Sequence, residues 1–272
     1  MEPPKVSVIT PAYNAGRYLN ETIQSILGQS FKDFEYIIID DRSTDNTWNI
    51  IKKYSRIDNR IVFVRNKENL GIAGNRNRGI SLAKGKYIAW QDADDISLPD
   101  RVKKQYRFLE KHSSVGMCGG YIRFFNEKGV IGVRKYAVND STVRSKIFLY
   151  SPVAQPTAMI RTKCFKELGQ YDLSCPPAED LDMAFRIGTK YKFANIPEVL
   201  LEYRVHPDSA TYSKLKRIEI NTIRIRKKYA KKYGYKMSLR DRVYCYLQYV
   251  SIFLIPPRIK IWLFNSIRNS KE

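Results

Sequence analysis

Cysteine and histidine are scarce in this chain, whose 272 residues include four cysteines and two histidines. The cysteines are widely separated and form no CxxC pair; they are Cys118, Cys164, Cys175 and Cys245. This spacing argues against a disulfide framework, a zinc site or redox chemistry. We therefore expect four reduced cysteines that contribute to packing.

Long hydrophobic runs are also missing, since no stretch reaches the roughly 18 apolar residues typical of a membrane span. The longest candidate, Val243 to Ile255, is interrupted by Gln248 and Ser251 and followed by two prolines. It suits a core helix or an interfacial segment. The N-terminus, MEPPKVSVITPAYN, lacks a basic region followed by an apolar one, so we expect no secretory signal and a cytoplasmic protein.

Negatively charged residues are few: the chain has 48 Lys and Arg residues and 27 Asp and Glu residues, for a net charge of +21. Such a balance implies an anionic partner, which can be nucleic acid, an acidic lipid surface or a phosphorylated substrate. One stretch runs against this trend. The segment "WQDADDISLPDR", residues 90–101, places Asp92, Asp94 and Asp95 within four positions.

The first hundred residues alternate strand and helix patterns. Strands are expected at 5–10, 35–40, 61–64 and 87–90, with helices near 18–27, 46–54 and 74–83 between them. This alternation predicts an α/β fold with a mainly parallel central sheet flanked by helices. Farther on we expect a helix at 101–111, strand-like pieces at 117–125 and 158–160, and a helix after residue 177.

Polar clusters follow three of the expected strands, at 11–14, 40–45 and 92–95. Ligands of open α/β sheets bind beyond the carboxyl ends of the strands, so these clusters predict one site. Asp92 and Asp94 can face the same crevice, where they would repel each other without a cation between them. Mg²⁺ or Mn²⁺ is suited to such oxygen ligands together with substrate phosphates. The alternative is a helix cap or solvated turn, a role that suits Asp100.

Several segments occur in an order and spacing that closely resembles family 2 glycosyltransferases with the GT-A fold. They are "TPAYN", "SILGQSF", "IIIDDRSTDNT", "NLGIAGNRNRGI", "GKYIAWQDADD" and "LPDR". The resemblance covers about residues 4–207. It implies that the acidic cluster is a DxD motif, which holds Mn²⁺ or Mg²⁺ on a nucleotide-sugar diphosphate.

The resemblance also assigns residues to the nucleotide-sugar site. Asp41 matches a carboxylate that contacts the base, where it can accept the N3 hydrogen of uracil, whereas Asp40 beside it equally suits a turn. Arg76 lies in a nucleotide-facing segment and can pair with phosphate, although that segment also reads as a glycine-rich loop before a helix. The full set for this site is Pro11, Ala12, Tyr13, Asn14, Asp41, Arg76, Asp92, Ala93 and Glu179.

Metal and catalytic roles complete what the resemblance implies. Asp94 matches the direct metal ligand, and His206 in "YRVHPDSAT" matches a histidine that reaches the metal or the diphosphate. Asp180 matches the base that removes a proton from the acceptor hydroxyl. The alternative for Glu179 and Asp180 is that both complement a helix N-terminus. Gln91 departs from the family's apolar residue, and the segment 155–161 resembles one near the acceptor.

The last sixty residues are basic and rich in tyrosine, with 16 Lys or Arg against three acids. Such a segment can pair with anionic headgroups and insert aromatic and aliphatic side chains into a membrane interface. The alternative is a helical cap packed on the preceding domain. Nucleic-acid binding is disfavoured, because no recognisable motif accompanies the basic residues.

We therefore expect a metal-dependent, inverting glycosyltransferase with a catalytic domain at 1–212, divided near residue 97 into nucleotide-sugar and acceptor halves, and a basic tail at 213–272. It would transfer one sugar from a UDP-sugar to a hydroxyl of a lipid-linked or growing glycan in cell-surface polysaccharide synthesis, on the inner face of the plasma membrane. The lack of a QxxRW element favours non-processive transfer. The alternative is a non-catalytic GT-A protein that binds nucleotide-sugar or glycan.

Overall fold

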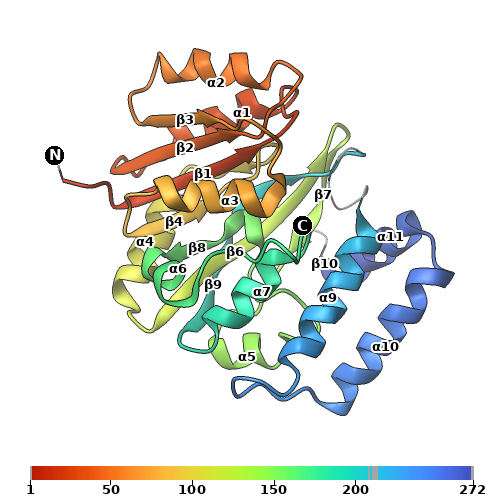
Figure 1. The fold of residues 1–272 in the computed structure, drawn as a ribbon. Coiled ribbons are helices and arrows are strands. Elements are labelled where there is room, and N and C mark those ends of the chain that lie inside the picture. Colours follow the sequence, from red (N-terminus) through yellow and green to blue (C-terminus); the bar gives the residue numbers. More distant parts are fainter. Residues whose placement is uncertain (1, 208, 210–213, 271–272) are drawn as a thin grey trace.

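A single mixed sheet runs through the molecule and carries helices on both faces (Figure 1). The structure is a computed structural model that describes residues 2–207, 209 and 214–270. The main path of the sheet has the strand order β10-β7-β6-β8-β4-β1-β2-β3. The parallel part consists of β1 (Val6–Ala12), β2 (Phe34–Asp40), β3 (Ile61–Arg65) and β4 (Tyr87–Trp90).

The second half of the chain extends this sheet with mostly antiparallel strands. β8 (Met159–Arg161) pairs with β4, and β6 (Val115–Asn126) pairs with both β8 and β7 (Gly129–Arg134). β9 (Lys192–Arg204) runs parallel to β6 and antiparallel to β5 (Ile96–Ser97), while β10 (Asn269–Ser270) joins β7. The α/β expectation is confirmed.

The helices expected in the first hundred residues, at 101–111, after residue 177 and in the C-terminal segment are present, whereas two short helices at 140–144 and 162–168 were not expected. In the first hundred residues they are α1 (Leu19–Leu27), α2 (Thr47–Ser55) and α3 (Gly71–Leu82). They are followed by α4 (Arg101–Lys111), α5 (Asp140–Arg144), the 3₁₀ turn η1 (Gln155–Thr157), α6 (Thr162–Leu168), α7 (Glu179–Ile187), α9 (Leu215–Tyr229), α10 (Leu239–Leu254) and α11 (Pro257–Arg268). All four cysteines are buried and unpaired, as expected.

The apolar run of β2 is buried on both faces. Ile37 and Ile39 pack into one core, and Tyr36 and Ile38 pack into the other. Successive side chains of a strand point to opposite faces, so an uninterrupted apolar run is suited to a strand covered by helices on both sides. This burial fixes the carboxyl end of β2, and therefore the polar residues that follow it.

The C-terminal helices form a lobe beside the end of the sheet (Figure 1). α9 is packed on α7, with the Tyr229 ring stacked on Phe185 at a centroid distance of 4.7 Å. α10 begins at a capping box between Ser238 and Asp241. The described helices include none long and apolar enough to cross a bilayer. The domain boundary expected at 212/213 lies outside the described residues.

α10 and α11 leave most of their large apolar side chains exposed or partly exposed. Within α10 only Asp241 and Cys245 are buried, and on α11 only Ile261 is. The larger exposed side chains of these helices include Tyr246, Leu247, Phe253, Leu254, Trp262 and Ile267. The segment expected at Val243–Ile255 therefore lies almost entirely in α10, and several of its apolar side chains are exposed.

Candidate active site

The loops after β1 and β2 are joined by hydrogen bonds at the carboxyl edge of the sheet. The Asn14 backbone N–H donates to Ser43 Oγ at 2.9 Å, and the Thr44 N–H donates to Asn14 Oδ1 at 2.9 Å. Asn14 has φ 49°, a left-handed conformation that asparagine tolerates better than most residues. Pro11 and Ala12 end β1. Tyr13 is exposed and therefore accessible to a ligand.

Asp41 holds the N-terminus of α3. Its Oδ1 accepts hydrogen bonds from Asn66 Nδ2 at 2.7 Å and the Leu70 N–H at 2.9 Å, and its Oδ2 accepts from the Gly71 N–H at 3.0 Å. The first N–H groups of a helix need such acceptors, which explains why α3 begins at Gly71, before the expected residue 74. A carboxylate has about four acceptor positions, so Oδ2 retains capacity for one more donor.

Arg76 and Glu179 form a buried ion pair that links α3 to the start of α7. Their side chains are 4 % and 2 % exposed, and Arg76 Nη1 lies 2.5 Å from Glu179 Oε1. Arg76 Nη2 lies 3.7 Å from Asp92 Oδ1, and the guanidinium packs over the rings of Trp90 and Tyr171. The structure thus brings together three residues that the sequence assigns to the nucleotide-sugar site.

Asp92 and Asp94 lie on the loop after β4 with environments that differ. Burial raises the pKa of Asp92 to about 6, with Asp94, Asp180 and Glu179 adding to the rise and Arg76 opposing it. Asp94 Oδ2 lies 2.8 Å from His206 Nε2, so the two residues assigned to the metal meet. Ala93 lies between the two aspartates in this loop.

The donor set of this loop fits Mn²⁺ or Mg²⁺. Two carboxylates supply the oxygen ligands that these cations prefer, and Mn²⁺ also accepts imidazole nitrogen. Within the described part of the chain the buried His206 Nδ1 has no hydrogen-bond partner, so the imidazole orientation depends on the contact with Asp94. Tyr18 packs against this ring, with centroids 4.9 Å apart.

Asp180 lies in the first turn of α7 and lines the same cavity as Arg76 and Asp92. Burial and the adjacent Glu179 carboxylate raise the pKa of Asp180, whereas Arg76 and the backbone N–H groups of the helix turn lower it. No described side chain forms a hydrogen bond or ion pair with its carboxylate. Gln155, which the sequence places near the acceptor, lines this cavity as well.

The sequence did not identify the residues that hold the acidic loop in place. Gln91 is fully buried, and its Nε2 donates to the backbone oxygens of Asp92 and Asp95 at 3.0 and 2.9 Å. Its Oε1 accepts from Arg101 Nη1 at 2.9 Å, and Arg101 Nη2 donates to the Trp90 carbonyl at 2.5 Å. The one signal was Gln91 itself, a polar residue where the family pattern is apolar.

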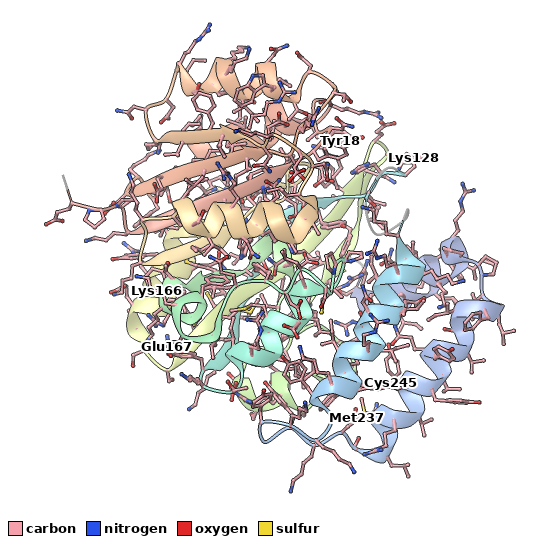
Figure 2. The ribbon with its side chains drawn as sticks, in the orientation of Figure 1. Tyr18, Lys128, Lys166, Glu167, Met237 and Cys245 are labelled. Atoms are coloured by element: carbon pink, nitrogen blue, oxygen red, sulfur yellow. The ribbon has the colours of Figure 1, made fainter. Side chains whose placement is uncertain are left out.

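Arg204, at the end of β9, also holds the loop after β4 through hydrogen bonds. Its backbone N–H donates to Asp95 Oδ1 and its Nε donates to the Asp94 carbonyl, both at 2.9 Å. Since His206 follows two residues later, these hydrogen bonds help to position its imidazole beside Asp94. Nearby, Arg17 Nη2 lies 2.7 Å from Glu127 Oε1, which joins the loop that carries Tyr18 to the hairpin tip at Lys128 (Figure 2).

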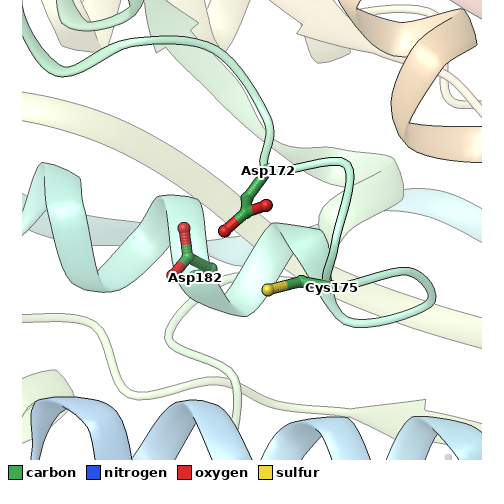
Figure 3. A group of neighbouring side chains, drawn as sticks. All are labelled: Asp172, Cys175 and Asp182. Atoms are coloured by element: carbon green, nitrogen blue, oxygen red, sulfur yellow. The ribbon is translucent and has the colours of Figure 1, made fainter.

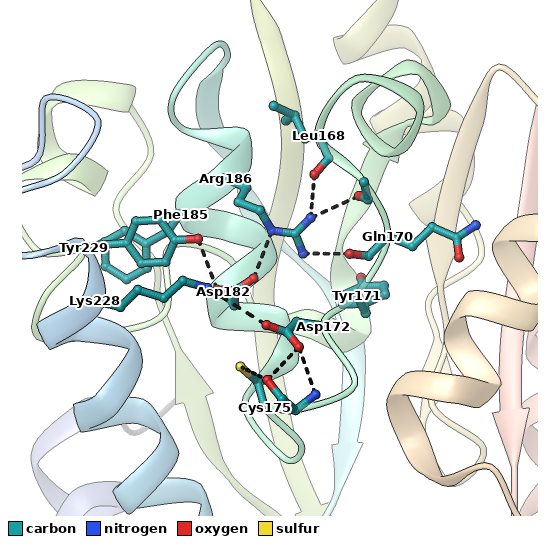
Figure 4. Close-up of polar contacts among 12 residues, drawn as sticks. Leu168, Gln170, Tyr171, Asp172, Cys175, Asp182, Phe185, Arg186, Lys228 and Tyr229 are labelled. Carbon is teal, nitrogen blue, oxygen red and sulfur yellow. Dashed lines mark hydrogen bonds and ion pairs between the residues drawn. The ribbon is translucent and has the colours of Figure 1, made fainter.

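A second acidic group consists of Asp172 and Cys175, on the segment before α7, and Asp182 on α7 (Figure 3). Asp182 accepts from Arg186 Nε at 2.9 Å, Lys228 Nζ at 2.8 Å and the Tyr229 hydroxyl at 3.1 Å (Figure 4). Two cations therefore already balance the two carboxylates. This group is an ion-pair network that fixes α9 to α7, and it offers no uncompensated charge for a metal.

The fold has GT-A architecture. The sheet aligns with the mannosyltransferase PcManGT from Pyrobaculum calidifontis in complex with GDP-Man and Mn²⁺, with a TM-score of 0.68 and 16 % identity over 99 % of this chain and 77 % of that chain. This likeness confirms the expected fold.

The chain belongs to glycosyltransferase family 2, whose model, "Glycosyl transferase family 2", matches residues 7–169. It is 36 % identical to an uncharacterized glycosyltransferase of Methanocaldococcus jannaschii, over 80 % of this chain and 76 % of that protein. It is 30 % identical to an Escherichia coli protein over 78 % of this chain and 82 % of the relative. That relative is named as the UDP-Glc:alpha-D-GlcNAc-diphosphoundecaprenol beta-1,3-glucosyltransferase WfaP. The expected enzyme class is confirmed.

Proposed function

We propose that this enzyme transfers a single sugar, with inversion, from a UDP-sugar to a hydroxyl of a lipid-linked or growing glycan in cell-surface polysaccharide synthesis. The observation that supports the proposal is the cavity that Asp180 and Asp92 both line, together with the lack of a described side-chain partner for the Asp180 carboxylate. The E. coli relative, whose name specifies UDP-Glc and a diphosphoundecaprenol-linked sugar, supports this choice of donor and acceptor.

The donor is held at the carboxyl edge of the sheet. The loop residues Pro11 to Asn14 surround the nucleoside, and Asp41 Oδ2 accepts one further hydrogen bond, which matches the N3 hydrogen of uracil. Asp92 lies near the ribose, and Asp94 with His206 would hold Mn²⁺ or Mg²⁺. When bound, such an ion supplies positive charge that stabilises the departing diphosphate. Arg76, fixed by Glu179, adds a cation at the same position.

Asp180 supplies the general base. Its carboxylate accepts the proton of the acceptor hydroxyl while that oxygen attacks the anomeric carbon, and the bond from this carbon to the diphosphate oxygen breaks on the opposite side. One displacement of this kind inverts the configuration. The raised pKa of Asp180 makes the carboxylate a stronger base than an exposed aspartate would be.

We place the enzyme at the inner face of the membrane. The basic C-terminal lobe can pair with anionic headgroups, and the exposed apolar side chains of α10 and α11 can enter the interface. In this proposal α9 is the helical cap packed on the preceding domain, and α10 and α11 present the apolar surface to the membrane.

Product release from a panel of UDP-sugars, measured with Mn²⁺ and then with EDTA, tests this proposal. We expect one UDP-sugar to be turned over with Mn²⁺ and none with EDTA. Asp94→Asn should weaken the Mn²⁺ dependence, and Asp172→Asn, on the neutralised network, is the matched control. The proposal would be overturned if no donor were turned over and donor affinity were the same with Mn²⁺ and with EDTA.

A further inference from the structure

A cavity of about 760 Å³ is lined by residues that precede α9 on one side and by residues of the C-terminal helices on the other. Its volume is within the range of about 300–1,000 Å³ that small-molecule sites occupy. Asp180 and Asp92 lie on its catalytic wall, and α9, α10 and α11 supply the opposite wall. Many of the side chains that line it are apolar, among them Ile122, Leu149, Val153, Ile218, Leu247 and Ile261.

Charge is divided between the two walls. The catalytic wall carries Asp92, Glu179 and Asp180 beside Arg76, while the far wall together with the adjoining end of β7 carries three arginines and one lysine against Glu219. Lys260 Nζ lies 2.6 Å from Glu219 Oε2, so this pair is neutral. The three arginines remain, and none of them forms an ion pair with a carboxylate of the described residues. They are Arg134, Arg226 and Arg268.

Arg134 is oriented by neutral groups. Its Nη2 donates to Asn265 Oδ1 at 2.7 Å and its Nε donates to Asn269 Oδ1 at 3.0 Å, while its Cζ lies 4.5 Å from the Phe124 ring centroid. Burial lowers the pKa of Arg134, and the charge of Arg268 adds to the lowering. The guanidinium is therefore held in place without being neutralised, beside a second cation.

The other two arginines are arranged in a similar way. Arg268 stacks on Tyr150, with Cζ 3.6 Å from the ring centroid. Arg226 is 4 % exposed and donates to Gln248 Oε1 at 2.8 Å and to the Leu149 carbonyl at 2.7 Å. Burying a cation without a counter-charge is costly, and an anionic ligand would offset that cost. Guanidinium groups suit phosphate in particular, because they donate two parallel hydrogen bonds.

We propose that this cavity binds the acceptor as a lipid diphosphate, with its phosphates at Arg134, Arg226 and Arg268 and its lipid chain against the apolar side chains of α9, α10 and α11. The sugar at the other end of the diphosphate then extends toward Asp180. The exposed apolar side chains of α10 and α11 continue this surface outward, as a ligand anchored in a bilayer requires. The inference rests on the proposed function and selects the lipid-linked acceptor.

Binding of three probes to the full chain tests this assignment: farnesyl diphosphate, inorganic pyrophosphate and farnesol, each measured calorimetrically in EDTA. Farnesyl diphosphate should bind at least about tenfold more tightly than either fragment, because it alone combines charge and apolar surface. Arg268→Gln should weaken farnesyl diphosphate by about tenfold and leave farnesol unchanged. Arg258→Gln, an exposed arginine on the same helix, is the matched control and should change neither.

Three outcomes would overturn the inference: pyrophosphate binding as tightly as farnesyl diphosphate, which indicates a simple anion site; an equal loss in Arg258→Gln; or no loss in Arg268→Gln. Arg134→Gln tests the second cation, with its melting temperature recorded because it also loses contacts to α11. UDP affinity in Mn²⁺ is measured separately. If UDP-sugars are not turned over but farnesyl diphosphate still binds through Arg268, the proposed function fails and the lipid site stands.

Discussion

Replacing Glu179 with glutamine removes one charge from the buried pair with Arg76 and keeps the side-chain shape. The glutamine amide has one oxygen where the carboxylate has two. In the native protein these two oxygens accept from Arg76 Nη1 at 2.5 Å and from the Ala178 N–H at 3.1 Å. In Glu179→Gln one of the two donors loses its acceptor, and the Arg76 charge keeps Asp92, at 3.7 Å, as its ion-pair partner, with Asp180 also nearby.

The size of the effect follows from burial. Removing one partner of a buried ion pair costs about 3–5 kcal/mol, since it leaves a charge without compensation. Asp92 provides part of the lost compensation, so we expect the lower end of this range, about 3 kcal/mol. For a domain of this size that loss lowers the melting temperature by roughly 6–12 °C.

Thermal unfolding followed by circular dichroism measures this shift. Glu127→Gln is the matched control, because its pair with Arg17 is similarly short but the two side chains are 83 % and 63 % exposed, and its melting temperature should not change. The double variant Arg76→Met/Glu179→Leu should recover much of the stability of Glu179→Gln but no activity. Equal melting temperatures for Glu179→Gln and Glu127→Gln would refute the reasoning.

Three further predictions follow from the site. A general base acts in its deprotonated form, so activity should rise with pH through a pKa above the ordinary aspartate value of about 4. In Glu179→Gln this rise should occur at lower pH, because the Glu179 charge no longer raises the pKa of Asp180. A pH profile of kcat at saturating donor measures both. Asp182→Asn should lower stability by about 3 kcal/mol in urea unfolding, because it leaves Arg186 and Lys228 without their shared carboxylate. Gln91→Leu should weaken UDP binding in a titration with Mn²⁺, since the loop after β4 loses the two hydrogen bonds from Gln91 Nε2. Unchanged UDP affinity would contradict a positioning role for Gln91.

Local sequence patterns predicted the four parallel strands of the sheet and a site at their carboxyl edge, but not the strands β7, β9 and β10. The apolar run at 36–39 indicated a strand, and polar clusters after three strands indicated a single edge of the sheet. The meeting of Asp94 with His206, 112 positions apart, was predicted only through the family resemblance. Residue spacing alone contains no information on such a contact.

Long-range pairings were beyond the reach of the sequence. Glu179 was assigned to the nucleotide-sugar site, but nothing in the local pattern indicated an ion pair with Arg76, 103 positions away. The parallel pairing of β6 with β9 and the joint burial of Gln91 and Arg101 also depend on tertiary packing. For the C-terminal segment, periodicity predicted helices but could not decide which faces they bury, because that depends on the surface of the catalytic domain against which they pack.

The central claim is that Asp180 removes the acceptor proton, and kcat of Asp180→Asn in sugar transfer tests it most directly. We expect a loss of about 10²–10⁴-fold, the usual contribution of a general base, with a much smaller change in UDP affinity in Mn²⁺ because Asp180 is not assigned to the metal or the nucleotide. Transfer by Asp180→Asn at the native rate, with the same pH profile, would contradict the account.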